Sequence, residues 1–478
     1  MDAALLPLAP LVVVAGTALL LILLDLLPPR TSKGHLGVVA LAGITATLVS
    51  AFFLWGRAAR AFSGVVVLDN FALFFDVVIC YAVALVLLLS FDYLRRNGME
   101  RGEYYILILF ATLGMLLMVH AADLIVIFLA LELMSLSLYV LAGFFRGQLV
   151  AGESAMKYFL LGAFATGFFV YGIALIYGAT GTTALDRIGA APGSAARDPL
   201  LLIGLGLLLV GFGFKISSVP FHMWAPDVYE GAPTSVTALI ATASKAAGFG
   251  ALLRVLLSTF RGAQPDWAVL LWVLAVLTMT VGNVVAIAQS NLKRMLAYSS
   301  IAHVGYMLVG VVAGGPLGAG GVLFYLLVYT FTTAGAFGVI LLLERGRREA
   351  VNLDDYGGLA TRHPVLALTL ALFLLSLIGI PPTAGFAGKF YLFGAAVRSG
   401  YIWLAIIAVL NSAVAAYYYL RLIVYMYMRD QEGVPTEPVP SFAGRLALGI
   451  ALWGVFQLGL MPAPVLDLAQ AAVAPLLR

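Results

Sequence analysis

Apolar runs about as long as a lipid bilayer is thick recur along the whole chain. A helix needs about 20 mostly apolar residues to cross the hydrocarbon core. Hydrophobic residues make up 63% of the sequence and charged residues only 10%, so most of the chain must lie in lipid rather than water. The sequence therefore predicts an all-α polytopic membrane protein of about 14 transmembrane helices, near residues 8–27, 36–56, 70–94, 103–120, 122–145, 153–179, 200–225, 233–259, 267–288, 294–313, 317–343, 364–397, 401–428 and 441–461.

Positive charge in this sequence indicates topology rather than nucleic-acid binding. The net charge is only +4, and the lysines and arginines lie mainly between the apolar runs. An even number of helices places both termini on one side. The loops on one side carry thirteen lysines and arginines and those on the other carry seven, so the positive-inside rule predicts that both termini face out. The first run lacks a basic leader and a small-residue cleavage site, and we expect a retained helix rather than a signal peptide.

Two five-helix blocks, about 103–260 and 267–428, have nearly equal length. Because five is odd, the second block is expected to insert upside down relative to the first. In each block the fourth helix is interrupted, by Pro220 in FKISSVPFHMWAP (214–226) and by Pro381 and Pro382 in LIGIPPTAGFAGKF (377–390). Interruptions at matching places in inverted repeats are typical of transporters whose site lies near the membrane midplane. Two ordinary proline kinks are the alternative.

These patterns predict a division of the chain into four parts. We expect N-terminal helices 1–3 in residues 1–100, a first repeat in 101–262, an inverted second repeat in 263–430 and helix 14 in 431–478.

Each charged residue inside a span requires a structural or functional explanation, because placing a charge at the centre of a spanning helix costs roughly 2.5–3.5 kcal/mol of insertion free energy. Lys245 lies about 12 residues into its run, or about 18 Å, which is too deep for its side chain to reach the surface. Thr242, Thr237 and Thr234 lie on the same helix face toward the inner surface. The pattern predicts half of a hydrated path that ends at Lys245. A lysine held by backbone carbonyls between helices is the alternative.

Glu132 lies about ten residues into the run 122–145, with Ser135 and Tyr139 on its face. It is either a titrating group coupled to a nearby lysine or half of a structural ion pair. Lys215 stands where Pro220 interrupts its helix, so freed carbonyls and hydroxyls can solvate it away from lipid. A change in its distance from Glu132 would change its proton affinity. A cation that merely neutralises the helix C-terminus is the alternative.

Lys389 follows the second interruption and lies about 16 Å of helix from the outer end near residue 400. We interpret it as the partner of Lys215 in the second repeat. Lys157 lies near the start of its run with Glu153 at i−4, so an ion pair at the membrane surface competes with a functional role.

Two histidines are further candidates. His303 lies deep in its run and is either a proton relay or an ordinary hydrogen-bonded core residue. His222 clusters with Asp227 and Glu230 beside the first interruption, where these residues either line its inner mouth or cap it.

Several kinds of chemistry are missing from the sequence. The lone cysteine, Cys80, excludes a cysteine-ligated iron–sulfur cluster and an internal disulfide, and we expect a buried thiol. The histidines do not have the spacing of a haem site, and no Walker A motif is present. We therefore expect no catalytic centre, metal site or bound cofactor in this chain.

Four segments carry a resemblance to a known family. FKISSVPFHMWAPDVYEGAPTSVTALIATASKAAGFGALLR (214–254) resembles the signature of the antiporter-like membrane subunits of respiratory complex I and of multisubunit cation/proton antiporters. Within that group it most resembles the subunit N type of NADH-quinone oxidoreductase. ELMSLSLYVL (132–141), NLKRMLAYSSIAHVGYMLVG (291–310) and GIPPTAGFAGKFYLF (379–393) also match, so the resemblance spans helices 4–13.

The resemblance assigns roles to individual residues. A lysine at 389 favours the N type over the M type, which tends to carry glutamate there, and the short segment after helix 14 differs from the L type. The resemblance matches Glu132 to the family's carboxylate on helix 5, Lys157 to a lysine on helix 6, Lys215 to the lysine on broken helix 7, Lys245 to that on helix 8 and Lys389 to that on broken helix 12.

The resemblance also implies a function. It implies a non-redox, proton-translocating subunit of a complex-I-type NADH:quinone oxidoreductase in a bacterial inner (plasma) membrane, beside related antiporter-like subunits. NADH, FMN, iron–sulfur clusters and quinone would bind to partner subunits, whose redox chemistry would drive protons through Glu132, the lysines, His303 and water. A subunit of a cation/proton antiporter and a purely structural membrane subunit are the alternatives.

Overall fold

The computed structural model describes residues 8–27, 33–190, 198–345, 348–430 and 435–477. Within these ranges, twelve helices are long and apolar enough to cross a membrane. They are α2 (Gly34–Leu54), α3 (Asn70–Arg96), α4 (Gly102–His120), α5 (Leu124–Ala142), α6 (Leu149–Thr180), α8 (Pro199–Ile216), the composite helix Thr234–Thr259, α12 (Gln264–Ile287), α13 (Leu292–Ala313), α14 (Gly315–Leu341), α18 (Ile402–Met428) and α19 (Phe442–Leu460).

The remaining two predicted spans are helical but shorter. Residues 8–27 form α1 (Ala9–Asp25), and 364–397 form two half-helices, α16 (Pro364–Ile378) and α17 (Ala384–Arg398). The expected all-α polytopic membrane fold with two discontinuous helices is therefore confirmed. The four-part division of the chain stays a prediction.

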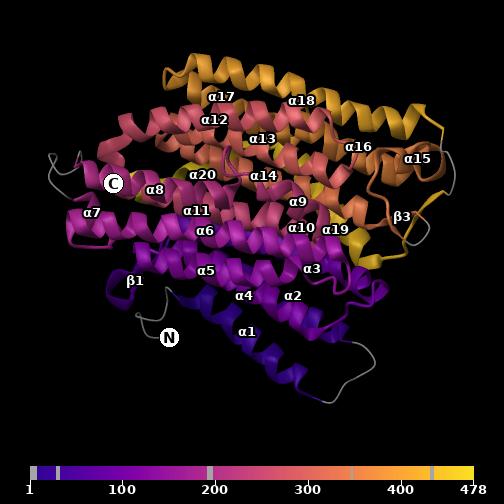
Figure 1. Cartoon of the computed structure of the whole chain (residues 1–478), viewed down its shortest axis with the longest axis horizontal. Coiled ribbons are helices and arrows are strands. Elements are labelled where there is room, and N and C mark those ends of the chain that lie inside the picture. The colour runs from indigo at the N-terminus through magenta and orange to yellow at the C-terminus, as the bar shows by residue number, and fades with distance from the viewer. Residues whose placement is uncertain (1–7, 28–32, 191–197, 346–347, 431–434, 478) are drawn as a thin grey trace.

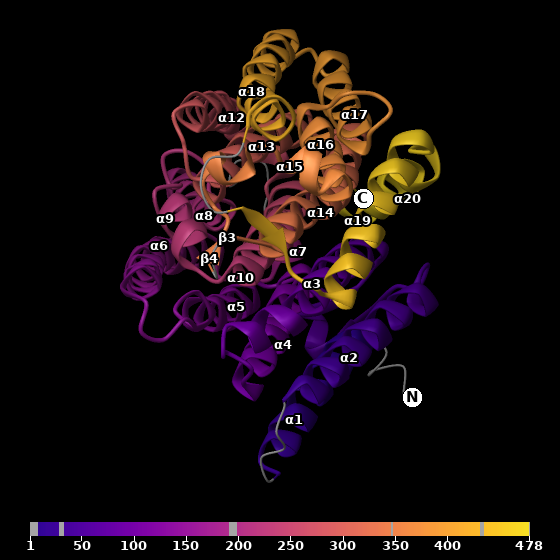
Figure 2. The ribbon, with the colours of Figure 1, turned by 90° about the vertical axis from the view of Figure 1, so that its right-hand side faces the viewer.

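The long helices run side by side, and their order in space largely follows the chain, from α1 and α2 at one edge to α17 and α18 at the other (Figure 1). The C-terminal α19 and α20 (Ala463–Val473) return along the flank formed by α14 and α3 (Figure 2). Helix α20 was not predicted. Its 11 residues are too short for a span, and it packs against α14.

The two ends of the bundle differ. One end, here called the basic end, carries the connections after α3, α5, α12, α14 and α18, where most of the predicted inner-side lysines and arginines lie. A small antiparallel sheet covers it, in the order β4 (Arg348–Glu349), β3 (Leu343–Arg345), β5 (Thr436–Pro438). The opposite end carries the hairpin β1 (Ala59–Ala61) and β2 (Val66–Leu68) and the short α7 (Leu185–Gly189) (Figure 1).

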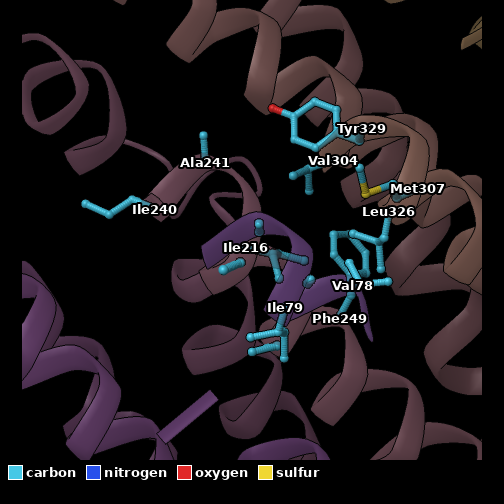
Figure 3. Packing of buried hydrophobic residues seen from close by; sticks show 14 of the residues in the cluster. Val78, Ile79, Ile216, Ile240, Ala241, Phe249, Val304, Met307, Leu326 and Tyr329 are labelled. Carbon is cyan, nitrogen blue, oxygen red and sulfur yellow. The ribbon is translucent and has the colours of Figure 1, made fainter. Parts of the chain in front are cut away.

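The core of the molecule lies around the composite helix Thr234–Thr259 and α14, which other helices enclose on all sides. Val78 of α3, Phe249, Met307 of α13 and Leu326 of α14 pack together there (Figure 3). Helices α2, α6, α12 and α18 instead leave most of their residues at the surface. The charged residues in the core are therefore surrounded by protein rather than by lipid.

The composite helix has two changes of pitch. It runs as α10 (Thr234–Leu239), a π-helical turn at Ile240–Ser244, α11 (Lys245–Arg254) and a second π-helical turn at Val255–Thr259. π-helical turns inside α-helices are rare and occur frequently at functional sites. Lys245 is the first residue after the first of these turns.

The two discontinuous helices have the same local architecture. Helix α8 ends at Ile216, and Ser217 takes a left-handed conformation with φ of 65°. Helix α16 ends at Ile378, and Gly379 takes a left-handed conformation with φ of 92°. In each case a proline in a cis peptide bond lies three residues after the left-handed residue, at Pro220 and Pro382. The first chain segment then continues as α9 (Trp224–Gly231), and the second as α17.

Candidate functional site

Lys215 lies in the last turn of α8 and is only 2% exposed. Its amine donates to the Ser135 hydroxyl of α5 at 3.2 Å and lies 3.5 Å from the Tyr158 hydroxyl of α6. The oxygen atoms around this ammonium are thus neutral. The expected solvation by hydroxyl groups is present, but they come from neighbouring helices rather than from the break itself.

Glu132 lies close to this position without bonding to Lys215. Its carboxylate accepts a hydrogen bond from Thr166 of α6 at 2.9 Å, and no ion pair between Glu132 and Lys215 occurs in the described part of the chain. Ser135, Thr166 and Lys215 line one small cavity with room for about one water molecule. The Glu132 carboxylate is therefore linked through Thr166 to the cavity beside Lys215.

The first break leaves several polar atoms without protein partners. The Ser217 and Ser218 hydroxyls and His222 Nδ1 are buried and find no hydrogen-bond partner among the described residues. The Trp224 indole donates to the Phe214 carbonyl at the end of α8 at 3.0 Å. Since buried polar groups are nearly always hydrogen-bonded, the three remaining atoms are suited to binding water. His222 therefore belongs to the break and does not contact the lysines.

Lys245 is fully enclosed, and its amine donates to the Ser300 hydroxyl of α13 at 2.5 Å and to the Ser300 carbonyl at 3.3 Å. Tyr329 of α14 donates to the same hydroxyl at 2.7 Å. The predicted threonines do not contact the amine: Thr242 donates to the Ala238 carbonyl and Thr237 to the Tyr229 carbonyl. The sequence did not predict Ser300 as the partner of Lys245, because Ser300 lies on another helix.

His303 lies one turn after Ser300 on α13. Its Nδ1 is 2.7 Å from the Tyr325 hydroxyl and its Nε2 is 3.2 Å from the Tyr419 hydroxyl. A hydroxyl can donate or accept, so either neutral tautomer of the ring satisfies both contacts. Tyr419 is in turn hydrogen-bonded to Ser299. This geometry allows a proton to be taken up at one ring nitrogen and released from the other.

Lys389 of α17 reaches back across the second break. Its amine donates to the carbonyls of Leu377 and Ile378 at the end of α16, both at 2.9 Å, and to Ser412 of α18 at 2.7 Å. It also lies 4.8 Å from the centre of the Tyr306 ring. The lysine thus caps carbonyls that the broken helix leaves without partners. Lys389 and Ser412 are the polar lining of an otherwise apolar groove of about 720 Å³ between α17 and α18.

Lys157 belongs to a surface network rather than to the buried group. Its amine is 2.7 Å from Glu153 and 2.7 Å from Asp227 of α9. Asp227 also bonds Arg294 of α13, which bonds Glu230, both at 2.8 Å. Burial raises the pKa of Asp227, but Lys157 and Arg294 together outweigh it and hold that pKa below its usual value. The surface pair with Glu153, one of the two alternatives for Lys157, is present, and Asp227 extends it.

Two buried ion pairs near the opposite end were not predicted. Asp76 of α3 pairs with His120 of α4 at 2.9 Å, and both side chains are fully buried. Arg254 pairs with Asp69, the residue that caps α3, through two hydrogen bonds of 2.9 and 3.0 Å. The sequence did contain a signal for Asp76, because a carboxylate two turns inside an apolar run needs a partner within the protein.

The helices that carry the buried basic residues contact one another one after the next. Helix α8 contacts α11, and the π-helical turn next to α11 contacts α14. Helix α14 contacts α13, and α13 contacts α17. Together these residues form a polar line through the apolar middle of the bundle. Each can bind or release a proton while keeping hydrogen bonds to neutral oxygens. No cluster of three or more metal-ligating side chains occurs among the described residues.

Comparisons with known proteins agree on one family. A family model described as NADH:quinone oxidoreductase/Mrp antiporter, TM, matches residues 121–415. NADH-quinone oxidoreductase subunit N of Trichlorobacter lovleyi is 51% identical over 471 residues, which cover 97% of this chain and 96% of that protein. A chain in the structure of respiratory complex I from Thermus thermophilus with bound aureothin is 38% identical, with a TM-score of 0.82, and the match covers 96% of this chain and 99% of that chain.

A chain in the structure of the Mrp complex from a Dietzia species matches with a TM-score of 0.87 at 23% identity, covering 100% of this chain and 98% of that one. That likeness shows a shared fold alone. The identity with subunit N, by contrast, is high and extends over nearly the whole length of both chains. The chain belongs to the NADH-quinone oxidoreductase subunit N family.

Proposed function

We propose that this chain is a proton-translocating membrane subunit of a complex-I-type NADH:quinone oxidoreductase. The observation that supports this most is the line of enclosed basic residues, Lys215, Lys245, His303 and Lys389, held by hydroxyl and carbonyl oxygens in a bundle otherwise filled with apolar side chains. Ionisable groups placed inside membrane spans are costly and typically mark an ion path.

Protons would enter from the basic end toward Lys245 and pass by way of Ser300, His303 and water to Lys389. Glu132, which is hydrogen-bonded to Thr166, and Lys215, which lines a small cavity with Thr166, would act as the switch. A protonation change on one alters the field at the other, and the altered field changes the proton affinity of Lys245 further along the line. Redox energy would act on this chain through a change of charge in neighbouring subunits and not through a bound substrate.

The remaining components would lie outside this chain. Partner subunits would bind NADH, FMN, iron–sulfur clusters and quinone, and related antiporter-like subunits would be the membrane neighbours. This chain would then have no catalytic centre of its own. We place it in a bacterial plasma membrane with the basic end inside and both termini outside, because loops rich in lysine and arginine stay in the cytoplasm.

The test is proton pumping by the assembled complex in sealed vesicles. Glu132→Ala and Lys215→Ala should strongly lower the number of protons moved per electron. Arg60→Ala is the control, because Arg60 forms an exposed ion pair with Asp186 away from the proposed route. An unchanged proton-to-electron ratio in both variants, with the complex intact, would refute the switch and indicate a structural subunit.

A cation/proton antiporter subunit is the second candidate, supported by the fold shared with the Mrp complex chain. Sodium-dependent proton transport in vesicles that contain this chain without a quinone-reducing partner would favour that function. Co-purification with quinone-reducing subunits in mild detergent would favour the first.

A further inference from the structure

A polar pocket of about 530 Å³ opens at the basic end of the bundle. Asn97 and Gln148 at its rim are exposed, so the pocket is open to water. Its other polar lining residues are Glu230, Asn291, Lys293, Glu349 and Asn352. They come from α9, from the start of α13, from strand β4 and from the loop after it, which places the pocket between the two five-helix blocks.

Glu349 stands between this pocket and the protein interior. Its side chain is 19% exposed, and Lys293 Nζ is 3.8 Å from its Oε2. On the inner side, its Oε1 accepts from the Tyr93 hydroxyl at 2.5 Å and its Oε2 accepts from the Thr234 hydroxyl at 2.6 Å. Tyr93 and Thr234 are buried. A single carboxylate therefore contacts the pocket and two enclosed hydroxyl groups.

Lys293 is fixed in this position rather than free to turn outward. It is nearly buried, and its amine donates to the Ala232 carbonyl at 2.8 Å. Its positive charge therefore acts on the Glu349 carboxylate from 3.8 Å, too far for a hydrogen bond. The NLKR segment of the sequence thus has a structural role: Asn291 caps α13, Lys293 faces Glu349 and Arg294 binds Asp227.

Thr234 is the first residue of the composite helix that carries Lys245. The two positions are separated by about 16 Å of helix. Thr237 lies one turn further on and donates to the Tyr229 carbonyl at 3.1 Å. The Tyr229 hydroxyl lies 3.3 Å from Ser300 Oγ, which holds the Lys245 amine. Polar groups therefore recur between the pocket and Lys245, and water molecules would have to connect them.

We propose that this pocket is the proton-uptake site of the chain, with Glu349 as the group that collects protons from water at the basic end. This inference rests on the proposed function. A proton from water binds to the Glu349 carboxylate. The Thr234 hydroxyl then gives its own proton to a water molecule on the inner side, which carries it toward the unprotonated Lys245 amine, and receives the Glu349 proton in exchange. One O–H bond thus replaces another on Thr234, and the carboxylate is restored.

A purely structural role for Glu349 predicts something different. Glu344 lies directly opposite Glu349 in the β3–β4 hairpin and forms a 2.6 Å ion pair with Arg96. That pair ties the hairpin to α3 and contacts no hydroxyl chain. Glu344 is therefore the matched control, because its loss disturbs the same hairpin without touching the proposed path.

The experiment measures the rate of proton pumping by the complete complex in vesicles, as a function of pH on the basic side. Glu349→Gln should lower the pumping rate severalfold, and the loss should grow as pH rises, since fewer protons then reach the path without a collecting carboxylate. Glu349→Asp should restore most of the rate, and Glu344→Gln should pump like wild type. Wild-type pumping by Glu349→Gln at every pH, or an equal loss in both Gln variants, would overturn the proposal.

A second measurement does not depend on how Glu349 variants fold. A cysteine at the exposed rim, Gln148→Cys, can be modified after assembly with a bulky cationic thiol reagent. Modification should slow pumping and reduction should restore it, whereas the same reagent on Arg60→Cys at the opposite end should have no effect. No slowing at Gln148→Cys would contradict the assignment.

The outcomes separate this inference from the function on which it rests. If Glu132→Ala and Lys215→Ala abolish pumping while Glu349→Gln and modified Gln148→Cys do not affect it, only the uptake site is wrong. If none of these changes affects pumping, the chain moves no protons and the proposed function itself is wrong.

Discussion

The three lysines of the polar line are held by neutral oxygens. Among the described residues, the amines of Lys215, Lys245 and Lys389 donate to hydroxyl groups and backbone carbonyls rather than to carboxylates. A buried ion pair loses its attraction when one partner is neutralised, which leaves a charge uncompensated. An amine that donates to hydroxyl groups or carbonyls retains two N–H donors when it is neutral, so it can keep up to two of these hydrogen bonds in either protonation state. This arrangement therefore permits proton exchange without loss of the local structure.

Lys389 gives a test of this arrangement. Lys389→Met removes the donor to the Leu377 and Ile378 carbonyls and to Ser412, and should destabilise the protein by about 1–3 kcal/mol. Ser412→Ala leaves both carbonyl contacts in place and should cost about 1 kcal/mol. The measurement is the thermal unfolding temperature of the purified complex. A larger loss for Ser412→Ala than for Lys389→Met would contradict the assigned contacts.

The sequence located the candidate lysines but not their partners. Depth within an apolar run singles out Lys215, Lys245 and Lys389, because a charge there needs a protein environment. Ser300, which holds Lys245, lies on another helix and has no local signal in the sequence. The threonines on the same face as Lys245 had the right periodicity, yet Thr242 donates to the Ala238 carbonyl of its own helix and Thr237 to the Tyr229 carbonyl of α9. Periodicity identifies a shared face but not which hydrogen bonds form.

At the level of elements, the two broken helices end in the same way, with one residue in the left-handed conformation. Gly379 can adopt it without strain, whereas Ser217 carries a side chain in a region costing roughly 1–2 kcal/mol for such residues. The second position is also tighter, because a Cβ atom on Gly379 would lie 3.1 Å from Lys389 Cδ. The same backbone turn therefore accepts a side chain at Ser217 more readily than at Gly379.

The substitutions Gly379→Ala and Ser217→Gly should therefore have opposite effects. Gly379→Ala should destabilise the protein by about 1–2 kcal/mol, while Ser217→Gly should be neutral or slightly stabilising. Gly394→Ala is the control, because Gly394 lies inside α17 and a Cβ there meets no atom within 4 Å. Thermal unfolding of each variant checks the order. Equal stability of Gly379→Ala and Gly394→Ala would contradict the role given to the left-handed turn.

The sequence predicted the long elements well and the short ones poorly. Run length and the prolines at 220, 381 and 382 predict the spans and both interruptions, because the bilayer sets helix length and proline removes a backbone donor. Helix α20 and the strands near Glu349 are too short for such a signal. The π-helical turn before Lys245 has no marker in the residues themselves.

Across the whole molecule, an ionic network joins the first five-helix block to the second. Asp227 of α9 bonds Lys157 of α6 and Arg294 of α13, and Arg294 also bonds Glu230. The Val219 backbone amide, at the first break, donates to Thr278 of α12. The switch and the second half of the proposed path are therefore connected at the basic end and beside the break.

This network predicts a pH dependence of stability. The pKa of Asp227 is lower in the folded protein than its ordinary value near 3.9. A lowered carboxyl pKa stabilises the fold fully at pH values above the unfolded pKa, and that contribution disappears as pH falls through the folded pKa. Asp227→Asn should therefore lower the unfolding temperature at pH 7, and the difference from wild type should shrink below about pH 4 and vanish at lower pH.

Asp186→Asn distinguishes this network from an ordinary surface pair. Arg60 lowers the pKa of Asp186 as well, but both side chains are largely exposed, and the pair joins a hairpin to a short helix rather than the two blocks. Exposed pairs contribute little to stability, so Asp186→Asn should leave the unfolding temperature unchanged at pH 7. If it lowers stability as much as Asp227→Asn does, surface charge in general is responsible. If Asp227→Asn alone lowers it, the contacts between the blocks hold the two halves of the path in register.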